Sequence, residues 1–401
     1  RGRARTTATE PQAPLLPLRR RGSLFMGCVM STAIGCLLCN NRCSIDRVVS
    51  QFAFFPPSPA SYTMEAHEGK LRIRFCDPEM AAAHENLQRN AAGGAVRVDC
   101  ARVETSRGSS VALLHFVHPA ARATLLWSHG NAMDIGEMYF FLLGLAAQMG
   151  VSVRAPRRRP RPARKPPSPR LSAPPPALAA PSSSFLVTIS RPRHMSPAPP
   201  PQVLAYDYSG YGASSGAPSE ANCYADIQAA HDYLRSRGVD SSSLLLYGQS
   251  VGSAPSLWLA ARCAVAGVVL HTPLMSGLRV LIPPHGGCCS LSGCCNPVCV
   301  YSLCDPFPNL ARIKKVRSPV LLLHGTHDST VDKSHTDGLY ARVPQQHRRP
   351  PYIVPGANHD NLVEANPDGY FDALEAFLSE AVAQGRGAGR GAPSGAEAPL
   401  A

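Results

Sequence analysis

Long hydrophobic runs are missing from this sequence of 401 residues. No stretch of about 18 or more apolar residues occurs, so we expect no transmembrane helix. The region after Arg1 also lacks the apolar core and small-residue cleavage site of a secretory signal, so we expect no signal peptide. An integral membrane protein and a secreted protein are therefore both disfavoured.

Acidic residues are missing from residues 154–202, which hold ten Lys or Arg. Residues 1–25 add six Arg against one Glu. These two segments account for the formal net charge of +13, because the rest of the chain has 24 basic and 26 acidic residues. The globular part is near neutral and lacks the basic surface that nucleic-acid binding requires. We therefore expect no nucleic acid among the partners.

Residues 154–202 also contain fifteen prolines and cannot bury a core, so we predict a disordered insertion. Residues 151–153 and 203–208 on either side would together make one continuous buried strand. A structureless loop of this length inside a central strand conflicts with a compact domain. Our hypothesis is that the segment comes from a retained intron or a gene-model error. If the mature protein contains it, the strand should begin near Val203.

The fourteen cysteines are clustered, with four at 28–43 and six at 288–304. This clustering favours a reducing compartment over a disulfide framework. The peptide Met26-Gly27-Cys28-Val29-Met30-Ser31 matches the N-myristoylation pattern when Met26 is the first residue. Myristoyl on Gly27 would anchor only weakly, and palmitoyl on a nearby cysteine such as Cys28 would supply the second signal. The alternatives are a chance Met-Gly pair and a zinc site at Cys36-x-x-Cys39, which Cys43 does not complete.

Strand and helix signals alternate through the rest of the chain, which predicts a mostly parallel α/β sheet with helices on both faces. We expect strands at 123–128, 203–208, 243–247, 265–271, 319–325 and 352–354. We expect helices at 136–149, from an N-cap at Ser219 to about Arg237, at 253–262 and at 370–383. Residues 384–401 are rich in Gly, Ala and Pro and predict a disordered tail.

The peptide Tyr247-Gly248-Gln249-Ser250-Val251-Gly252 lies between a predicted strand and a predicted helix. A Gly-x-Ser-x-Gly pattern in this context is typical of a sharp turn that exposes a nucleophilic serine at the top of a sheet. Side chains at Gly248 and Gly252 would collide as the turn closes. Alone the pattern is weak, and a plain glycine turn is the alternative.

A serine nucleophile needs a base, and the base needs an acid that orients it. In this class of fold the order along the chain is Ser, then Asp or Glu, then His. Asp328 and His359 follow predicted strands in that order after Ser250. We therefore predict Ser250 as nucleophile, His359 as general base and acid, and Asp328 as the residue that fixes the imidazole tautomer.

Other acidic and histidine residues lie close to the predicted triad in the sequence. Asp332 is a rival acid, and Asp328 is preferred because of its position in the loop. His324 and His327 are rival bases, but they break the required chain order. His271 ends a predicted strand, where we expect a packing or hydrogen-bonding role.

The oxyanion hole should use two backbone N–H groups. One is that of Val251, directly after the nucleophile. The second should come from His129-Gly130-Asn131-Ala132, the loop after an early strand, and Asn131 is the expected donor. An ordinary strand-exit turn is the alternative for this loop.

Four motifs together make the resemblance to a family specific: Leu126-Trp127-Ser128-His129-Gly130-Asn131-Ala132-Met133-Asp134, Tyr206-Asp207-Tyr208-Ser209-Gly210-Tyr211-Gly212-Ala213-Ser214-Ser215-Gly216, Leu246-Tyr247-Gly248-Gln249-Ser250-Val251-Gly252 and His324-Gly325-Thr326-His327-Asp328. The sequence resembles the α/β-hydrolase-domain protein depalmitoylases over about residues 45–383, apart from 154–202. Phe52-Ala53-Phe54-Phe55-Pro56-Pro57 resembles the family's region just after its cysteine-rich N-terminus. The resemblance implies an α/β-hydrolase fold with a short cap and no cofactor or metal.

The resemblance further implies an enzyme that removes S-palmitoyl groups from membrane-associated proteins such as Ras-like GTPases. Its N-terminal cysteines, which correspond here to Cys28, Cys36, Cys39 and Cys43, would be palmitoylated and would bind the membrane surface. The implied location is the cytoplasmic face of the plasma membrane or of endosomal membranes, for a peripheral monomer. The expected organisation is a non-native or disordered leader at 1–25, a cysteine-rich lipid-anchor segment at 26–50, an α/β-hydrolase domain at 51–383 interrupted by the insertion at 154–202, and a disordered tail at 384–401.

Two departures from the family pattern leave alternatives open. A Met-Gly start is not the family's usual beginning. Residues 288–304 carry more cysteines than the family pattern predicts, and they could be a second acylated membrane contact, a metal site or a plain cysteine-rich loop. The alternatives for the whole protein are a general carboxylesterase or lipase with the same triad, and an inactive binding module.

Overall fold

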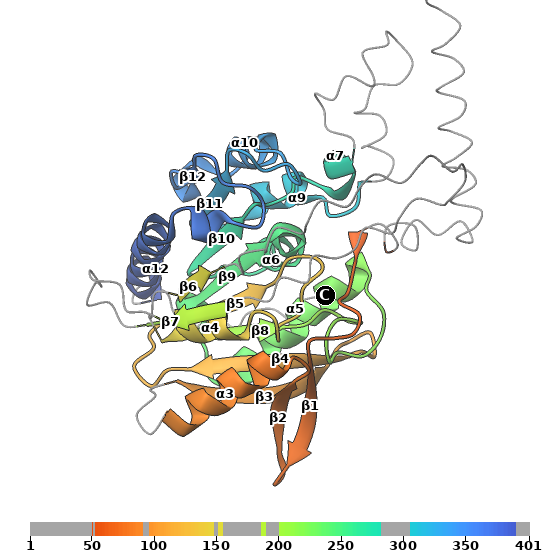
Figure 1. Cartoon of the computed structure of the whole chain (residues 1–401). Coiled ribbons are helices and arrows are strands. Elements are labelled where there is room, and N and C mark those ends of the chain that lie inside the picture. Colours follow the sequence, from red (N-terminus) through yellow and green to blue (C-terminus); the bar gives the residue numbers. More distant parts are fainter. Residues whose placement is uncertain are drawn as a thin grey trace, which may run out of the picture.

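The computed structural model describes residues 53–90, 96–147, 151–154, 186–189, 200–281 and 305–389, together with Ser50. Its central feature is a ten-stranded sheet with the order β1-β2-β3-β4-β8-β5-β9-β10-β11-β12 (Figure 1). The strands are β1 Tyr62–His67, β2 Lys70–Phe75, β3 Arg97–Glu104, β4 Ser110–Val117, β5 Thr124–Ser128, β8 Gln202–Tyr206, β9 Leu244–Gln249, β10 Gly267–His271, β11 Val320–Gly325 and β12 Tyr352–Val354.

The sheet has an antiparallel and a parallel half. Each of β1 to β4 runs antiparallel to its neighbour, and β4 is antiparallel to β8. From β8 to β12 every neighbouring pair is parallel. Ser128 lies opposite both Tyr206 and Gly248, and His271 lies opposite Gln249. The carboxyl ends of the parallel strands therefore meet at one edge, where open α/β sheets place their sites.

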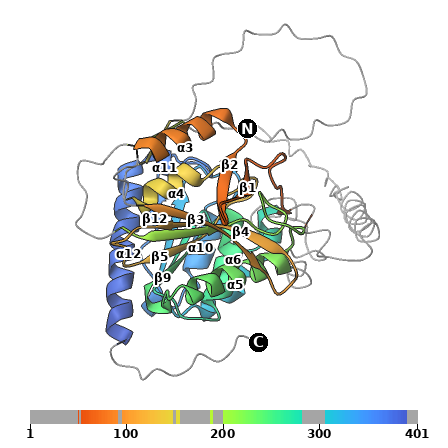
Figure 2. The ribbon, with the colours of Figure 1, turned by 90° about the horizontal axis from the view of Figure 1, so that it is seen from below.

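Helices cover both faces of this sheet. Figure 2 shows α3 and α4 on one side of the strands and α5 and α6 on the other. The helices are α3 Pro78–Asn90, α4 Tyr139–Ala146, α5 Glu220–Ser236, α6 Ser253–Ala260, α7 Gly277–Leu281, α9 Asn309–Arg312, α10 Ser334–Tyr340, α11 Leu362–Ala365 and α12 Pro367–Gly389. The strands between the two layers are nearly continuous apolar runs, as expected when both faces are buried.

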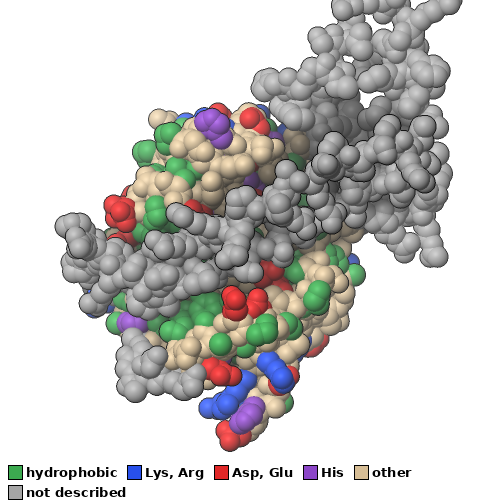
Figure 3. All heavy atoms as spheres, viewed as in Figure 1, with side chains coloured by type: hydrophobic (Ala, Val, Ile, Leu, Met, Phe, Trp, Pro, Cys, Tyr) green, Lys and Arg blue, Asp and Glu red, His purple; other side chains and the backbone are tan. Residues whose placement is uncertain are grey.

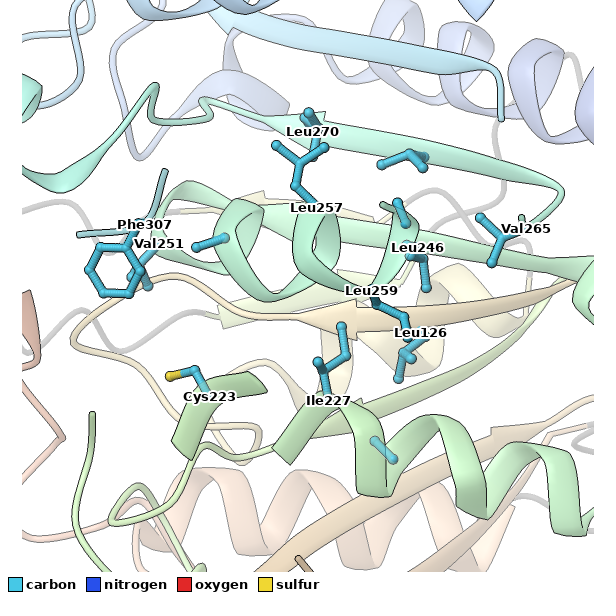
Figure 4. Packing of buried hydrophobic residues seen from close by; sticks show 14 of the residues in the cluster. Leu126, Cys223, Ile227, Leu246, Val251, Leu257, Leu259, Val265, Leu270 and Phe307 are labelled. Atoms are coloured by element: carbon cyan, nitrogen blue, oxygen red, sulfur yellow. The ribbon is translucent and has the colours of Figure 1, made fainter. Parts of the chain in front are cut away.

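Alternating side chains of each central strand divide the core in two. In β9, Leu244 and Leu246 belong to the cluster under α5 and α6, whereas Leu245 and Tyr247 belong to the cluster under α4 and α12. Figure 4 shows Leu257 of α6 beside Leu270 of β10 within the first cluster. Burying each such leucine stabilises the fold by about 1.5–3 kcal/mol. The strands whose ends carry the site are therefore held by core packing on both faces of the sheet.

The predicted α/β-hydrolase fold is confirmed, with a mostly parallel central sheet and helices on both faces. The predicted N-cap is also confirmed, because the Ser219 side chain accepts a hydrogen bond from the N–H of Asn222 at the start of α5. The four antiparallel strands β1 to β4 were not predicted. The last helix runs to Gly389, six residues beyond its expected end at 383 and into the predicted tail.

The continuous strand expected from residues 151–153 and 203–208 applies to a chain without residues 154–202, so it stays a prediction for this chain, which contains them. β6, Val151–Arg154, pairs antiparallel with β7, Leu186–Ile189, in a separate two-stranded sheet. The apolar run at Leu186–Ile189 inside the expected insertion offers residues 151–154 a pairing partner of its own. β8 begins at Gln202 without them, as expected if the mature chain contains the segment.

Other expectations lie outside the described residues, including the lipidation sites Gly27, Cys28, Cys36, Cys39 and Cys43, the 288–304 cysteines and the cap. Among the described residues, no helix is long and apolar enough to cross a membrane, and no group of three or more His, Cys, Asp or Glu could hold a metal ion.

On the face drawn in Figure 3, acidic and basic side chains lie together at the β1–β2 hairpin, where Arg74 pairs with Glu65.

Candidate active site

Ser250 lies on a sharp turn between β9 and α6. Its backbone φ is +52°, in the left-handed region that L residues rarely adopt. A Cβ on Gly248 would lie 2.5 Å from the carbonyl oxygen of Gly252, and one on Gly252 would lie 2.2 Å from that of Ser128. Both glycines are therefore required by close backbone contacts. The turn continues into α6 at Ser253, whose N-terminal end favours negative charge nearby.

Ser250, His359 and Asp328 form a connected chain of hydrogen bonds. The Oγ of Ser250 lies 3.0 Å from Nε2 of His359, and Nδ1 of His359 lies 2.7 Å from Oδ2 of Asp328. An ionised carboxylate can only accept, so Nδ1 carries the proton and Nε2 is free to accept the serine proton. The structure thus brings together the three residues that the sequence predicts, in the geometry of a nucleophile, a base and an orienting acid.

Asp328 is fixed on its far side by the backbone. Its Oδ1 accepts hydrogen bonds from the N–H groups of Thr330 at 2.9 Å and Val331 at 2.8 Å. Burial acts to raise the pKa of Asp328, but the hydrogen bond from His359 and those two N–H groups lower it below its ordinary value. The carboxylate therefore stays ionised and available to His359 at neutral pH.

Asp332 and His327 lie outside this chain of hydrogen bonds. Asp332 accepts a hydrogen bond from the N–H of Ser334 near the start of α10. His327 is exposed, and its Nδ1 contacts the hydroxyl of Thr326. The geometry therefore favours Asp328 over Asp332 as the acid and His359 over His327 as the base.

His324 and His271 are buried and hydrogen-bonded. Nε2 of His324 lies 2.9 Å from the carbonyl oxygen of Val331 and 3.3 Å from Oδ2 of Asp328. Nδ1 of His271 lies 2.7 Å from the hydroxyl of Tyr247, and burial lowers the pKa of His271 to about 3. His271 therefore stays neutral and has the hydrogen-bonding role predicted from the sequence. His324 buttresses Asp328 and does not reach the nucleophile.

The predicted oxyanion loop lies directly against the serine turn. A Cβ on Gly252 would also lie 2.7 Å from the carbonyl oxygen of His129, which shows how closely the two segments approach. Val251 follows Ser250 in the turn, and Asn131 lies in the facing loop. The N–H of Ala132 is already bonded to Oδ1 of Asn131. The N–H groups of Val251 and Asn131 thus remain the predicted donors.

Two tyrosines that carried no predicted role hold this loop. The hydroxyl of Tyr208 donates to the carbonyl oxygen of His129 at 2.7 Å, and that of Tyr211 donates to Oδ1 of Asn131 at 2.7 Å. Both belong to the motif Tyr206-Asp207-Tyr208-Ser209-Gly210-Tyr211, quoted above for the resemblance alone. The signal that could have pointed to them is a set of three closely spaced tyrosines, Tyr206, Tyr208 and Tyr211, at the end of a buried strand.

The buried carboxyl group of Asp207 lies beside the loop, with its Oδ1 3.5 Å from Nε2 of His129. Asp207 accepts hydrogen bonds from the hydroxyl of Tyr62 at 2.5 Å and from the N–H of Ile135 at 2.9 Å. Burial, with the nearby charge of Asp134, raises the pKa of Asp207 well above its ordinary value. Burial also lowers the pKa of His129 to about 4. A neutral His129 therefore adds no positive charge beside the hole.

The chain is similar to a known protein family and to several known proteins. Residues 218–384 match the prolyl oligopeptidase family. Human alpha/beta hydrolase domain-containing protein 17B is 34% identical over 350 residues, 86% of this chain and 95% of that protein. Protein 17C of Xenopus laevis is 34% identical over 86% of this chain and 92% of its own length.

One further protein and one solved structure are also similar to this chain. The alpha/beta hydrolase domain-containing protein aho-3 of Caenorhabditis elegans is 34% identical over 82% of this chain and 77% of its own length. Among solved structures, the Pyrococcus furiosus esterase Pf2001 aligns with a TM-score of 0.45 and 14% identity over 71% of this chain and 92% of its own. At the level of identity shared with 17B, 17C and aho-3, the chain belongs to the alpha/beta hydrolase domain-containing protein 17 family of serine hydrolases.

Proposed function

We propose that this protein hydrolyses acyl thioesters and removes S-palmitoyl groups from membrane-associated proteins. The observation that carries the proposal is the hydrogen-bonded chain from Ser250 through His359 to Asp328 at the carboxyl edge of the sheet. The choice of a thioester rests on the resemblance to depalmitoylases in the motifs described above.

The reaction would proceed through an acyl-enzyme. Oγ of Ser250 attacks the thioester carbonyl carbon while Nε2 of His359 takes the hydroxyl proton. The carbonyl oxygen becomes an oxyanion held by the N–H groups of Val251 and Asn131. The C–S bond then breaks, the cysteine sulfur leaves, and His359 returns the proton to it. Water, deprotonated by His359, releases palmitate from Ser250 in the second half.

A thioester suits this machinery on chemical grounds. A cysteine thiol has an ordinary pKa near 8.5, far below that of a serine or threonine hydroxyl. A thiolate therefore leaves with little help from a proton donor, so attack by Ser250 limits the rate. The N–H groups around the oxyanion act on that step. We expect thioesters to react faster than oxygen esters of the same acyl chain.

The test compares two peptides of one sequence, one with S-palmitoyl-cysteine and one with O-palmitoyl-serine, using the full-length chain. We expect palmitate release from the thioester at least about tenfold faster, and no release by Ser250→Ala. A fluorophosphonate probe should label the wild type and not Ser250→Ala. A preference for short-chain oxygen esters would instead establish a carboxylesterase, and a wild type that does not react with the probe would establish an inactive binding module.

We further propose a peripheral, lipid-anchored monomer on the cytoplasmic face of the plasma membrane or of endosomal membranes. Two lipid groups on Gly27 and on Cys28, Cys36, Cys39 or Cys43 would give stable attachment where one would not. S-acylated membrane proteins would then meet the enzyme on the same surface. Mass spectrometry of the mature N-terminus tests this directly. A mature chain that retains residues 1–25 would contradict myristoylation of Gly27.

A further inference from the structure

Residues 53–55, named here the entry strap, lie against the oxyanion loop at residues 129–132. Figure 1 shows the start of the described chain extending past β1 toward α5, at the edge of the sheet that carries the site. We propose that the entry strap positions the oxyanion loop through the side chains of Asn131 and Tyr211, so that both are positioning residues for the hydrolysis. The proposal rests on the proposed function only in taking Ser250 as the nucleophile.

The side-chain amide of Asn131 binds the backbone of the strap at two points. Its Nδ2 donates to the carbonyl oxygen of Ala53 at 2.8 Å, and its Oδ1 accepts from the N–H of Phe55 at 2.9 Å. Both hydrogen-bonding sides of the amide are therefore used by one short segment that is 76 to 78 positions away in the sequence. This pairing fixes the orientation of the Asn131 side chain and holds the strap on the loop.

Tyr211 contacts both the entry strap and the oxyanion loop. Its hydroxyl donates to Oδ1 of Asn131 at 2.7 Å and accepts from the N–H of Phe55 at 3.0 Å. The Tyr211 ring is fully buried, so its hydroxyl has a fixed position. One tyrosine hydroxyl thus joins the strap and the loop at the same place.

The same Asn131 oxygen sets the backbone of the loop. It accepts a third hydrogen bond, from the N–H of Ala132 at 2.9 Å, and Ala132 has a left-handed φ of +57°. A non-glycine residue in this region is strained and persists only when its surroundings hold it. With the N–H of Ala132 bound to the side chain, the N–H of Asn131 stays the predicted oxyanion donor of this loop.

The strap is clamped on its other side by aromatic packing. Phe54 is buried, and its ring meets that of Tyr211 at 6.4 Å and that of Phe307 at 5.8 Å, both edge to face. Phe307 belongs to the same buried cluster as Val251, and Figure 4 shows both residues. A displaced strap would therefore loosen the surroundings of both predicted oxyanion donors.

The sharpest test is Tyr211→Phe in the full-length chain, because it removes the hydroxyl and keeps the ring that packs on Phe54. With p-nitrophenyl butyrate as substrate, we expect kcat to fall about tenfold with KM within about twofold. This is a fraction of the ~10²–10³-fold loss when a whole oxyanion donor is removed. The inhibition constant of a trifluoromethyl ketone should rise by the same factor as kcat/KM falls, because its adduct with Ser250 carries the oxyanion.

The matched control is Tyr370→Phe, which also loses a buried hydroxyl contact, 2.6 Å from the hydroxyl of Tyr247, in the core cluster on the other face of the sheet from Phe54 and Phe307. It should lower the melting temperature to a similar extent and leave kcat unchanged. As a second variant, Phe55→Pro removes the N–H that binds Asn131 and Tyr211, and Phe55→Ala separates that loss from the loss of the ring. Phe55→Pro should show the same fall in kcat as Tyr211→Phe.

The outcomes separate this proposal from the proposed function. If Tyr211→Phe and Phe55→Pro lower only the melting temperature and leave kcat and inhibitor affinity unchanged, the strap is structural and the proposal is wrong. If the wild type hydrolyses p-nitrophenyl butyrate but not the palmitoyl thioester, the thioesterase assignment fails. The effect of the strap variants on kcat can still be measured with p-nitrophenyl butyrate. A wild type that hydrolyses neither would overturn both.

Discussion

Replacing Asp328 with Asn exchanges one carboxylate oxygen for an NH₂ group. Hydrogen bonds from the backbone decide which way the new amide points. The N–H groups of Thr330 and Val331 need an acceptor at the position of Oδ1. The amide oxygen of Asn will therefore take that position and place its NH₂ 2.7 Å from Nδ1 of His359. Nδ1 must then accept a hydrogen bond, so the imidazole proton moves to Nε2. Nε2 becomes a donor toward Ser250 and can no longer accept the serine proton.

The loss can be estimated from the chemistry of that tautomer. With Nε2 protonated, His359 cannot accept the serine proton, and a comparable change in a serine protease lowers kcat by about 10⁴-fold. This corresponds to about 5 kcal/mol of transition-state stabilisation. We expect kcat for an activated ester at pH 7 to fall by about 10³–10⁴-fold with little change in KM. Crystals or NMR spectra should show the fold unchanged.

The control is Asp332→Asn, because Asp332 lies in the same loop and accepts from the N–H of Ser334. It should keep kcat within about twofold of the wild type. The reasoning would be refuted if Asp328→Asn kept more than about a tenth of the activity. It would also be refuted if Asp332→Asn caused the larger loss, since the acid would then be Asp332.

Three further predictions concern stability and the serine turn. Gly252→Ala should lower the free energy of unfolding by about 1–3 kcal/mol and reduce kcat at least about 10²-fold. The reason is that the new Cβ would lie 2.2 Å from the carbonyl oxygen of Ser128. Denaturant unfolding measures the first effect and ester hydrolysis the second. Ser219→Ala should lower the free energy of unfolding by about 1 kcal/mol and leave kcat unchanged, because the N–H of Asn222 loses its side-chain cap. An unchanged melting temperature in calorimetry would contradict this prediction. The lowered pKa of Asp328 adds stability above about pH 4 that is lost as the pH falls through the folded-state pKa, so melting temperatures of Asp328→Asn should depend less on pH below 4 than those of the wild type.

The parallel half of the fold was predictable because its strands are buried on both faces. Runs such as residues 265–271 and 319–325 contain almost no polar residue, and only a strand between two helical layers requires this. The antiparallel half was not predicted. Strands β1 to β3 carry mixed patterns, whereas β4 is an apolar run that was missed although it has the pattern of a buried strand. β1 reads Tyr-Thr-Met-Glu-Ala-His, and only its first residue is fully buried. An edge strand has no apolar period that sequence alone can recognise.

The triad was predictable because chain order and strand ends constrain it. Ser250, Asp328 and His359 each follow a strand whose register the hydrophobic pattern already indicates. Hydrogen bonds that depend on tertiary distance were not predictable. The contact of Asn131 with Ala53 and Phe55 joins positions 76 to 78 residues apart, and nothing local in either segment indicates the other. The pairing of β6 with β7 was missed for the same reason.

The residue at which β8 begins matters for splice isoforms. Gln202 opens this strand opposite Thr124, at the amino end of the parallel strands, whereas Ser250 lies beyond their carboxyl ends. Any length that a transcript adds or omits between β6 and β8 therefore joins the sheet on the side away from the nucleophile. Two isoforms that differ only there are expected to share one catalytic centre and one acyl preference.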